Sequence, residues 1–464
     1  MTRATLAYRG PSAEPDPTAF PPDFLWGAAT SAYQIEGGVD EGGRGPSIWD
    51  TFAHTPGKTA DGDTGDVACD HYHRWSDDLD LIAGLGLRAY RLSVSWPRLQ
   101  PGGRGPLNPE GVAFYRALLE GLRDRGVRPF VTLYHWELPQ ALEDAGGWPM
   151  RDTAARFADF TRLTVAALGD LADDWITLNE PWCQAFLGYG SGIHAPGRRD
   201  LRAAVAAAHH LNVAHGLATQ AIRAERPSAM LGIADIVADV LPASRREEDV
   251  AAAERYDANS NRLFLDPVLL GRYDERVLDL YRDHGLETLI EPGDEALVAS
   301  PMDFLALNHY QRVMVSHDPQ DTHLGARGVP AEPATTSLGW SVTPDAFRDV
   351  LLRVHREYPP IPLYVTENGA AFDDRVGDDG QVTDAERVDY LRGYLGAAAE
   401  AIGAGVDLRG YFAWSLMDNF EWGEGYRSRF GLVYVDYHTQ ERIPKASARW
   451  YRDLITRHRS SRRS

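Results

Sequence analysis

The sequence predicts an α/β protein built as a single (β/α)8 barrel with long loops after its strands. The first observation is an alternation, because short apolar, β-branched or aromatic runs are followed by amphipathic helical stretches eight times over. The second observation is continuity, because no linker or low-complexity stretch divides the chain after Phe24. Eight strand–helix units in one uninterrupted chain are typical of this barrel.

Each expected strand is a nearly continuous apolar run, which is typical of parallel strands that are buried on both faces. Two of the intervening helices carry clear end signals. Asn108 and Pro109 cap and start one helix that Gly126 closes, and Thr383 with Glu386 forms a capping box before another. In chain order, the eight runs are 24–31, 89–96, 128–136, 173–181, 230–237, 303–310, 362–369 and 409–416.

The chain has 464 residues, whereas a minimal barrel needs roughly 250 residues. We therefore expect the excess to lie in loops, of which the largest candidate is 311–340, a polar segment rich in Pro and Gly. A doubly wound open sheet is the alternative fold. It favours a Gly-rich phosphate loop after its first strand, and the segment GAATSAYQ (27–34) is not such a loop.

The two ends of the chain differ in composition from the middle. Residues 1–19 are rich in Pro, Ala and polar residues, and we expect a flexible tail there. The last residues, 457–464, are basic, and we expect a second solvated tail. The barrel domain should therefore span 20–456.

The formal net charge is −20, from 47 basic and 67 acidic residues. Such a surface repels phosphate backbones and anionic membranes, so we expect no nucleic-acid or membrane partner. No apolar run approaches the roughly 20 residues that cross a bilayer, and the N-terminal segment lacks the apolar core of a signal peptide. With only two cysteines, Cys69 and Cys183, these features predict a protein of the reducing cytoplasm.

Metal and cofactor chemistry is not expected. Lys58 and Lys445 are the only lysines, and neither lies in an expected strand, which argues against a Schiff-base mechanism. His71 and His73 resemble a metal-binding pair but follow no strand, and adjacent histidines on a helix, as at 209–210, point apart.

Barrel enzymes carry their reactive side chains at the C-terminal ends of the strands. In this sequence those ends are dense in carboxylates, amides and indoles. They are Tyr134-His135-Trp136 on the third strand, Asn179-Glu180-Pro181 on the fourth, Asn308-His309-Tyr310 on the sixth, Glu367-Asn368-Gly369 on the seventh, and Trp414 to Trp422, including Glu421, on the eighth.

Two of these residues form a candidate catalytic pair. Glu180 and Glu367 lie on strands three steps apart around an eight-stranded ring, and burial behind apolar strands should raise at least one pKa. Such a pair suits glycosidic bond cleavage, in which one carboxyl group protonates the leaving oxygen and the other attacks the anomeric carbon. Nearby indoles offer flat faces to sugar rings. Cys183 is expected to serve packing.

Four segments resemble the signatures of family 1 glycoside hydrolases, the β-glucosidase family. In order they are FLWGAATSAYQIEGG (24–38), TLNEPW (177–182), YVTENG (364–369) and the long segment 410–437. The resemblance covers the chain from about Phe20 to about Leu454, with the motifs in the expected order and spacing.

The resemblance implies a retaining mechanism in which Glu180 is the acid/base and Glu367 is the nucleophile. It also implies that Asn179 binds the 2-hydroxyl of the sugar and that Tyr310 holds Glu367 and keeps it ionised. The chain departs from the family at His309, where tyrosine is common, and this change alters the surroundings of Tyr310.

The resemblance further implies a set of sugar-binding side chains. Glu421 would span the 4- and 6-hydroxyls, Trp414 would form the floor of the glycone site, and Trp340 would offer an aglycone platform. Because relatives that act on 6-phosphoglycosides have serine in place of Glu421, phosphorylated sugars are disfavoured. The full expected substrate-binding set is Gln34, His135, Trp136, Asn179, Asn308, Tyr310, Trp340, Trp414, Glu421, Trp422 and Phe430.

We therefore expect a cytoplasmic β-glucosidase that removes terminal non-reducing β-D-glucosyl residues from small β-glycosides or short oligosaccharides, as in cellulose degradation. Side activity on β-fucosides or β-galactosides is expected. Three alternatives stay open, namely a non-catalytic sugar-binding barrel, a metal-dependent barrel hydrolase and a transglycosylase. The sequence leaves the aglycone undecided, as well as the choice between a monomer and a homo-oligomer.

Overall fold

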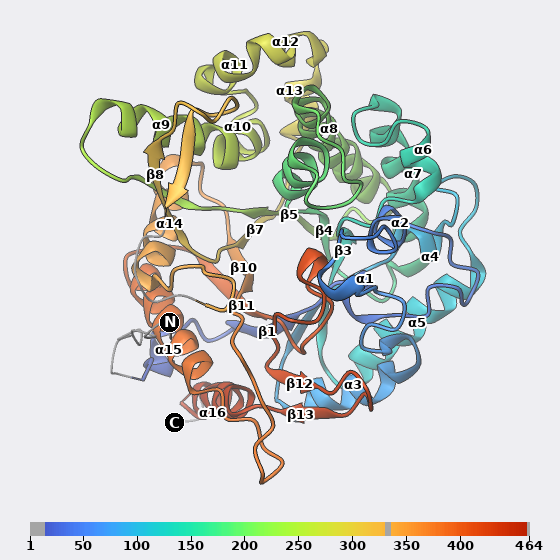
Figure 1. The fold of residues 1–464 in the computed structure, drawn as a ribbon. Coiled ribbons are helices and arrows are strands. Elements are labelled where there is room, and N and C mark those ends of the chain that lie inside the picture. Colours follow the sequence, from blue (N-terminus) through green and yellow to red (C-terminus); the bar gives the residue numbers. More distant parts are fainter. Residues whose placement is uncertain (1–13, 330–335, 462–464) are drawn as a thin grey trace.

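Eight parallel strands close into a barrel at the centre of the computed structural model (Figure 1), which describes residues 14–329 and 336–461. The last strand of the ring, β11, pairs back onto the first, β1. The predicted (β/α)8 barrel is confirmed, and the doubly wound alternative is wrong. Around the ring the strands are β1 (Leu25–Ala29), β2 (Ala89–Ser93), β3 (Arg128–Tyr134), β4 (Asp174–Asn179), β5 (Met230–Ile236), β7 (Phe304–Asn308), β10 (Leu363–Asn368) and β11 (Leu408–Trp414).

Seven of the eight predicted runs contain one of these strands whole, and β11 begins one residue before the eighth run, 409–416. Both small and large apolar side chains fill the inside of the barrel. The Phe130 ring, for example, lies 4.9 Å from the Phe412 ring and 5.3 Å from that of Tyr364. This filling makes the strand ends, rather than a central channel, the place where a ligand can bind.

Helices surround the strands, and a large apolar cluster fills the layer between them (Figure 1). The principal helices are α3 (His71–Gly84), α5 (Pro109–Asp124), α7 (Arg151–Leu168), α8 (Leu201–Glu225), α14 (Pro344–Glu357), α15 (Ala385–Gly403) and α16 (Ala446–Ser460). Shorter helices near the strand ends are α1 (Ala32–Ile35), α2 (Ile48–Ala53), α4 (Trp96–Leu99) and α6 (Gln140–Asp144).

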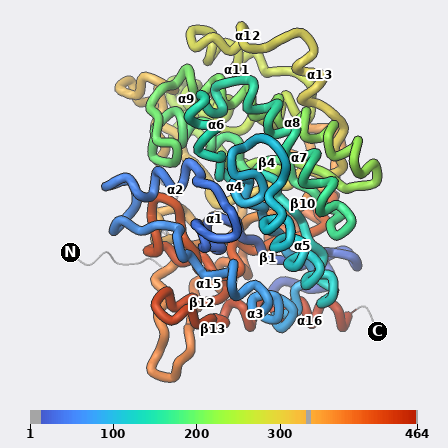
Figure 2. The backbone as a smooth tube through the Cα atoms, turned by 90° about the vertical axis from the view of Figure 1, so that its right-hand side faces the viewer, coloured from blue at the N-terminus to red at the C-terminus, as the bar shows by residue number. Residues whose placement is uncertain are grey.

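The connection between β5 and β7 carries helices of its own, which are α9 (Glu247–Asp257), α10 (Leu263–Leu270), α11 (Glu275–Tyr281), α12 (Leu286–Leu289) and α13 (Asp294–Val298). Helices α11 and α12 stand at the opposite end of the molecule from the paired strands β12 (Val433–Val435) and β13 (Arg442–Pro444), as Figures 1 and 2 show.

The two predicted helix starts have different outcomes. Asn108 caps α5 as expected, and Gly126 beyond its end has a φ of 66°, in the left-handed region that glycine adopts readily. The predicted capping box at Thr383 is wrong, because α15 begins one residue later, after Asp384. The Asp384 carboxylate accepts hydrogen bonds from the amide and hydroxyl of Ser447 and so joins α15 to α16.

The predicted loop 311–340 contains two strands in its described part. Strands β8 (Arg312–His317) and β9 (Ala326–Val329) pair antiparallel, and β8 also pairs with β6 (Asp239–Pro242) from the β5–β7 connection. These strands are short and largely half-buried, so they lack the continuous apolar pattern of the barrel strands.

The chain ends also differ from the expected tails. Residues 14–19, predicted to be flexible, pack against the last helices, and Glu14 accepts hydrogen bonds from Trp450 at 3.1 Å and from Arg392 at 2.9 Å. Helix α16 continues through Arg457 to Ser460, so this part of the predicted C-terminal tail is helical. The predictions for 1–13 and 462–464 fall outside the described residues.

No helix in the described ranges is long and apolar enough to span a bilayer. Both cysteines are buried as free thiols.

Candidate active site

A cavity of about 660 Å³ opens at the C-terminal ends of the barrel strands. The predicted site residues that line it are His135, Trp136, Glu180, Tyr310, Trp340, Glu367, Trp414, Glu421, Trp422 and Phe430. The other three, Gln34, Asn179 and Asn308, are buried behind this wall. Each of them hydrogen-bonds to a lining residue, so the predicted set forms one connected site.

The backbone changes register just before each of the two paired glutamates. The pairing of β4 with β5 shifts ahead of Asn179, and that of β10 with β7 shifts ahead of Glu367. Glu180 has a φ of 44°, and its amide donates to the Ala234 carbonyl at 2.7 Å. Bulges beside active sites re-aim side chains, and strained backbone persists there only when neighbouring contacts hold it.

Two donors hold Glu367 as a carboxylate. Arg91 Nη1 lies 2.5 Å from Oε1, and the Tyr310 hydroxyl donates to Oε2 at 2.6 Å. Burial raises the pKa of Glu367 above its ordinary value, and the Arg91 charge and the Tyr310 hydrogen bond oppose this rise and favour the ionised form. Arg91 also donates to Asn179 at 2.5 Å, so the same guanidinium reaches the tip of β4.

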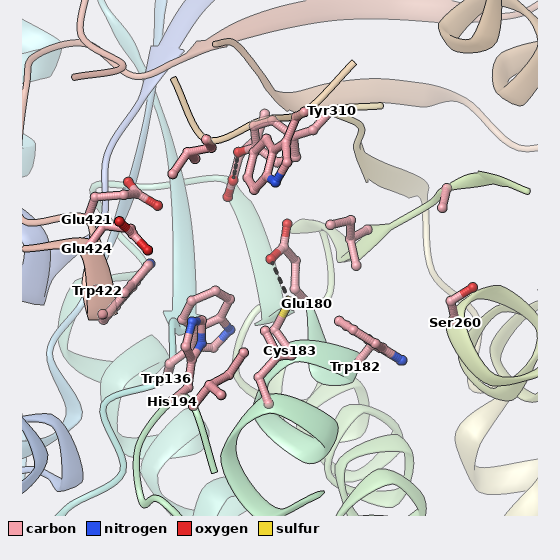
Figure 3. Close-up of a pocket in the computed structure, with 18 of the residues that line it drawn as sticks. Trp136, Glu180, Trp182, Cys183, His194, Ser260, Tyr310, Glu421, Trp422 and Glu424 are labelled. Carbon is pink, nitrogen blue, oxygen red and sulfur yellow. Dashed lines mark hydrogen bonds between the residues drawn. The ribbon is translucent and has the colours of Figure 1, made fainter. Parts of the chain in front are cut away.

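Glu180 lies in a different environment. Asn308 donates to its Oε1 at 2.8 Å, and the Cys183 thiol lies 3.3 Å from its Oε2, as the dashed line in Figure 3 shows. Burial and then the charge of Glu367 raise the pKa of Glu180 to about 8. Neighbouring carboxyl groups with different environments can divide the roles of acid and nucleophile.

Glu421 supplies a third carboxyl group on the wall of the cavity. Gln34 donates to Glu421 Oε2 at 3.4 Å and to Asn419 Oδ1 at 3.0 Å. Burial, with the charges of Glu367 and Glu180, raises the pKa of Glu421 to about 8. A protonated carboxyl group both donates and accepts hydrogen bonds, which suits a pair of sugar hydroxyls.

Aromatic rings form much of the remaining wall. The His135 ring stacks at 5.9 Å from both the Trp414 and the Trp422 rings, with interplanar angles of 14° and 18°. On another part of the wall, the Trp340 ring lies 5.3 Å from the Tyr310 ring. Such flat faces can pack against the C–H faces of a sugar.

Sequence reasoning missed Arg91 and underestimated Cys183. Arg91 is fully buried in β2. The sequence could have indicated it, because Arg91 is the single cation within the apolar run 89–96 and a buried charge needs a partner. Cys183 packs as expected, but it also contacts Glu180. It begins the π-helix η3 (Cys183–Ser191), a rare element that is frequent at functional sites.

Across the described ranges, no group of three or more His, Cys, Asp or Glu side chains could hold a metal ion. The histidines that resembled metal pairs have other partners. His71 lies 2.8 Å from an Asp78 oxygen, and His209 lies 3.0 Å from an Asp294 oxygen.

A barrel that carries a buried glutamate pair among aromatic walls at its strand ends has the construction of a glycoside hydrolase. The family model described as Glycosyl hydrolase family 1 matches residues 16–460. The chain is 49% identical over 443 residues to a thermostable beta-glucosidase B from Thermobispora bispora, covering 95% of this chain and 91% of that protein.

Two further comparisons agree with this match. A bifunctional beta-D-glucosidase/beta-D-fucosidase from Bifidobacterium breve is 48% identical over 459 residues, which cover 95% of this chain and 98% of that protein. The structure of a family 1 β-glucosidase from Thermotoga maritima superposes with a TM-score of 0.91 at 46% identity, covering 95% of this chain and 98% of that one. The chain therefore belongs to glycosyl hydrolase family 1, a family of retaining enzymes with a glutamate nucleophile and a glutamate acid/base.

Proposed function

We propose that this protein is a retaining β-glucosidase in which Glu180 acts as the acid/base and Glu367 as the nucleophile. The observation that carries the assignment is the contrast between the two carboxyl groups. Arg91 and Tyr310 hold Glu367 as an oriented carboxylate, whereas burial raises the pKa of Glu180 to about 8 and keeps it protonated at neutral pH.

In the first step, a carboxylate oxygen of Glu367 attacks the anomeric carbon while Glu180 transfers its proton to the glycosidic oxygen. A bond forms between Glu367 and the sugar, the bond to the aglycone breaks, and the aglycone leaves as an alcohol. Proton transfer of this kind accelerates a reaction by about 10²–10⁴-fold.

In the second step, Glu180 is a carboxylate and removes a proton from an incoming water molecule. The water attacks the anomeric carbon from the opposite face and releases Glu367, so two inversions give net retention. An alcohol in place of water would give transglycosylation from the same intermediate.

We infer a preference for β-glucosides over other β-glycosides from the side chains around Glu421 and from the relatives, which are named as β-glucosidases. Gln34 and Asn419 hold the Glu421 side of the cavity, where a 4- and a 6-hydroxyl could both be bound. Fucosides lack the 6-hydroxyl and should lose part of this contact. A 6-phosphate would place a dianion beside Glu421 and close to the ionised Glu367, whose charge already acts on Glu421, and should be rejected.

We also propose that the enzyme acts in the cytoplasm on small β-glucosides and short oligosaccharides, including products of cellulose degradation. The two free, buried thiols suit a reducing compartment.

Trapping the covalent intermediate tests the assignment. A dinitrophenyl 2-deoxy-2-fluoro-β-glucoside has a leaving group that needs no proton, and its fluorine slows release of the sugar from the enzyme. Peptide mass spectrometry should find the fluoroglucosyl group on Glu367, and the Glu367→Gln variant should remain unlabelled. Label on Glu180 would contradict the assignment.

A substrate panel tests the specificity. We expect kcat/KM for nitrophenyl β-glucoside to exceed the values for the fucoside, the galactoside and especially the 6-phosphoglucoside. A chelator should leave these values unchanged, and inactivation by the chelator would instead support the metal-dependent alternative.

A further inference from the structure

Two cations, Lys58 and Arg199, line the outer part of the active-site cavity. Lys58 is half-buried and Arg199 is exposed, whereas Glu180 and Glu367 are buried at the deep end. Within the described ranges, neither cation forms an ion pair, and neither side chain donates a hydrogen bond. Both charges are therefore available to a ligand.

The two cations flank one short loop, which runs from Gly192 to Arg199. A Cβ atom added at Gly197 would lie 3.4 Å from the Lys58 ammonium. One added at Gly192 would lie 2.8 Å from the Gly197 carbonyl and 3.0 Å from the Arg199 side chain. The Lys58 ammonium and the base of the Arg199 side chain therefore lie against the same loop, from which the long Arg199 side chain can extend its guanidinium toward a group held by Lys58.

This loop continues the aromatic wall of the cavity. The ring of His194 lies 5.4 Å from the Trp136 ring, and Figure 3 shows the two side by side. The adjacent Ile193 lines the cavity although 56% of it is exposed. Phe52 also lines the cavity, and its ring lies 5.1 Å from the Lys58 ammonium. The two cations thus stand among apolar surfaces that could cover a flat aglycone.

Glu424, two residues after Trp422, is an exposed acid on the lining, and its negative charge opposes the two cations. Figure 3 shows it beside Glu421 and Trp422, on the side of the cavity opposite Trp182. It has no ion pair with Lys58 or Arg199 in the described structure. The outer part of the cavity therefore keeps an excess of one positive charge, in contrast to the acidic deep end and to the net charge of −20.

We infer that the outer part of the cavity binds aglycones that carry a carboxylate on an apolar or aromatic body, with the carboxylate held by Lys58 and Arg199. This inference rests on the proposed function, since it describes the group that the glucosidase releases. Long-range attraction is opposed by the acidic surface, so the preference arises on contact. Because both cations remain accessible to solvent, each should contribute about a two- to fivefold gain in kcat/KM.

Three matched substrates test the inference, namely 4-nitrophenyl β-glucoside and its derivatives with a carboxylate or a carboxamide at the ring 3-position. The measured quantity is the ratio of kcat/KM for the carboxylate to kcat/KM for the carboxamide, which isolates charge from shape. The ratio should fall about two- to fivefold in Lys58→Met and in Arg199→Gln, and further in the double variant. High salt should lower the ratio of the unchanged enzyme.

Two control variants sharpen the test. Arg198 neighbours Arg199 but pairs with Glu143 at 3.3 Å and does not line the cavity, so Arg198→Gln should keep the ratio. Glu424→Gln removes the opposing charge and should raise it. An unchanged ratio in the Lys58 and Arg199 double variant would overturn the inference while leaving the glucosidase assignment intact. Failure of the unchanged enzyme to cleave any of the three substrates would instead overturn the proposed function.

Discussion

Arg91 and Glu367 form an ion pair of 2.5 Å in which the guanidinium side chain is 0% exposed and the carboxylate side chain 4% exposed. The same guanidinium donates to Asn179, which precedes Glu180. One cation thus contacts the proposed nucleophile and the strand tip that carries the proposed acid. Because a buried charge without its partner is strongly unfavourable, this contact helps to set the protonation state of Glu367.

The first prediction concerns Arg91→Lys. Lysine keeps the charge, but it is a compact donor that cannot replace the planar fork that reaches Glu367 and Asn179 together. Hydrogen bonds to charged groups contribute about 1.5–3 kcal/mol, so kcat should fall by roughly 10- to 100-fold. The acidic limb of the pH profile should move to higher pH, because lysine keeps the charge but loses the guanidinium hydrogen bond that also lowers the pKa of Glu367. The exposed Arg88→Lys is the control, and an unmoved acidic limb in Arg91→Lys would contradict the prediction.

The second prediction is a bell-shaped dependence of kcat/KM on pH. Glu367 must be ionised to attack, so activity is lost as pH falls through its pKa. Glu180 must be protonated to assist the leaving group, so activity is lost as pH rises through a pKa of about 8. Cellobiose should show this alkaline limb. Dinitrophenyl β-glucoside needs no proton to leave and should lack it, whereas an equal limb with both substrates would argue against Glu180 as the acid.

The third prediction separates the two glutamates by the products of azide rescue. Glu180→Ala should still form the glycosyl-enzyme from dinitrophenyl β-glucoside, and azide, which needs no base, should release a β-glucosyl azide. Glu367→Ala leaves an empty face from which azide attacks the substrate directly, so the product should be the α-azide. Proton NMR of the anomeric centre distinguishes the two. Reversed anomers would exchange the two assignments.

The fourth prediction concerns the thiol of Cys183, whose hydrogen bond lowers the pKa of Glu180. Cys183→Ala should therefore move the alkaline limb with cellobiose to higher pH, and Cys183→Ser, which keeps a donor, should restore it at least in part. Cys69→Ala is the matched control, because that buried thiol bonds to the Asp418 carbonyl instead. A limb that stays in place in Cys183→Ala would reduce the thiol to a packing role.

The strands were predictable because burial on both faces leaves a continuous apolar run in the sequence, as at 362–369 and 409–416. The start of α15 near Thr383 was not predictable, because it depends on hydrogen bonds that Ser447, distant in the sequence, donates to the side chain of Asp384. Strands β8 and β9 were missed for a similar reason, since their pairing depends on partners in other parts of the chain. The residue pattern of a short segment carries no information about partners that lie far away in the sequence.

The same division holds within the site. Glu180 and Glu367 could be predicted because each follows an apolar strand, and the C-terminal ends of the strands of a closed barrel meet at one face. Their protonation states depend on Arg91, which comes from β2, and on Asn308 and Tyr310, which come from the end of β7. The backbone shifts that aim both glutamates leave no compositional mark, so the sequence indicated the chemistry without its geometry.

The contacts of Glu14 with Trp450 bear on how this chain is made. The ring of strands closes between β1 and β11, the first and last of its strands to leave the ribosome. The indole of Trp26 also donates to His458 at 2.9 Å, near the end of α16. Until α16 has been synthesised, Trp26 in β1 lacks its hydrogen-bond partner His458. The apolar layer between the barrel and this helix also stays uncovered. Completion of the barrel is therefore a late event in synthesis, and a terminal fusion that disturbs α16 would act on folding yield before it acted on catalysis.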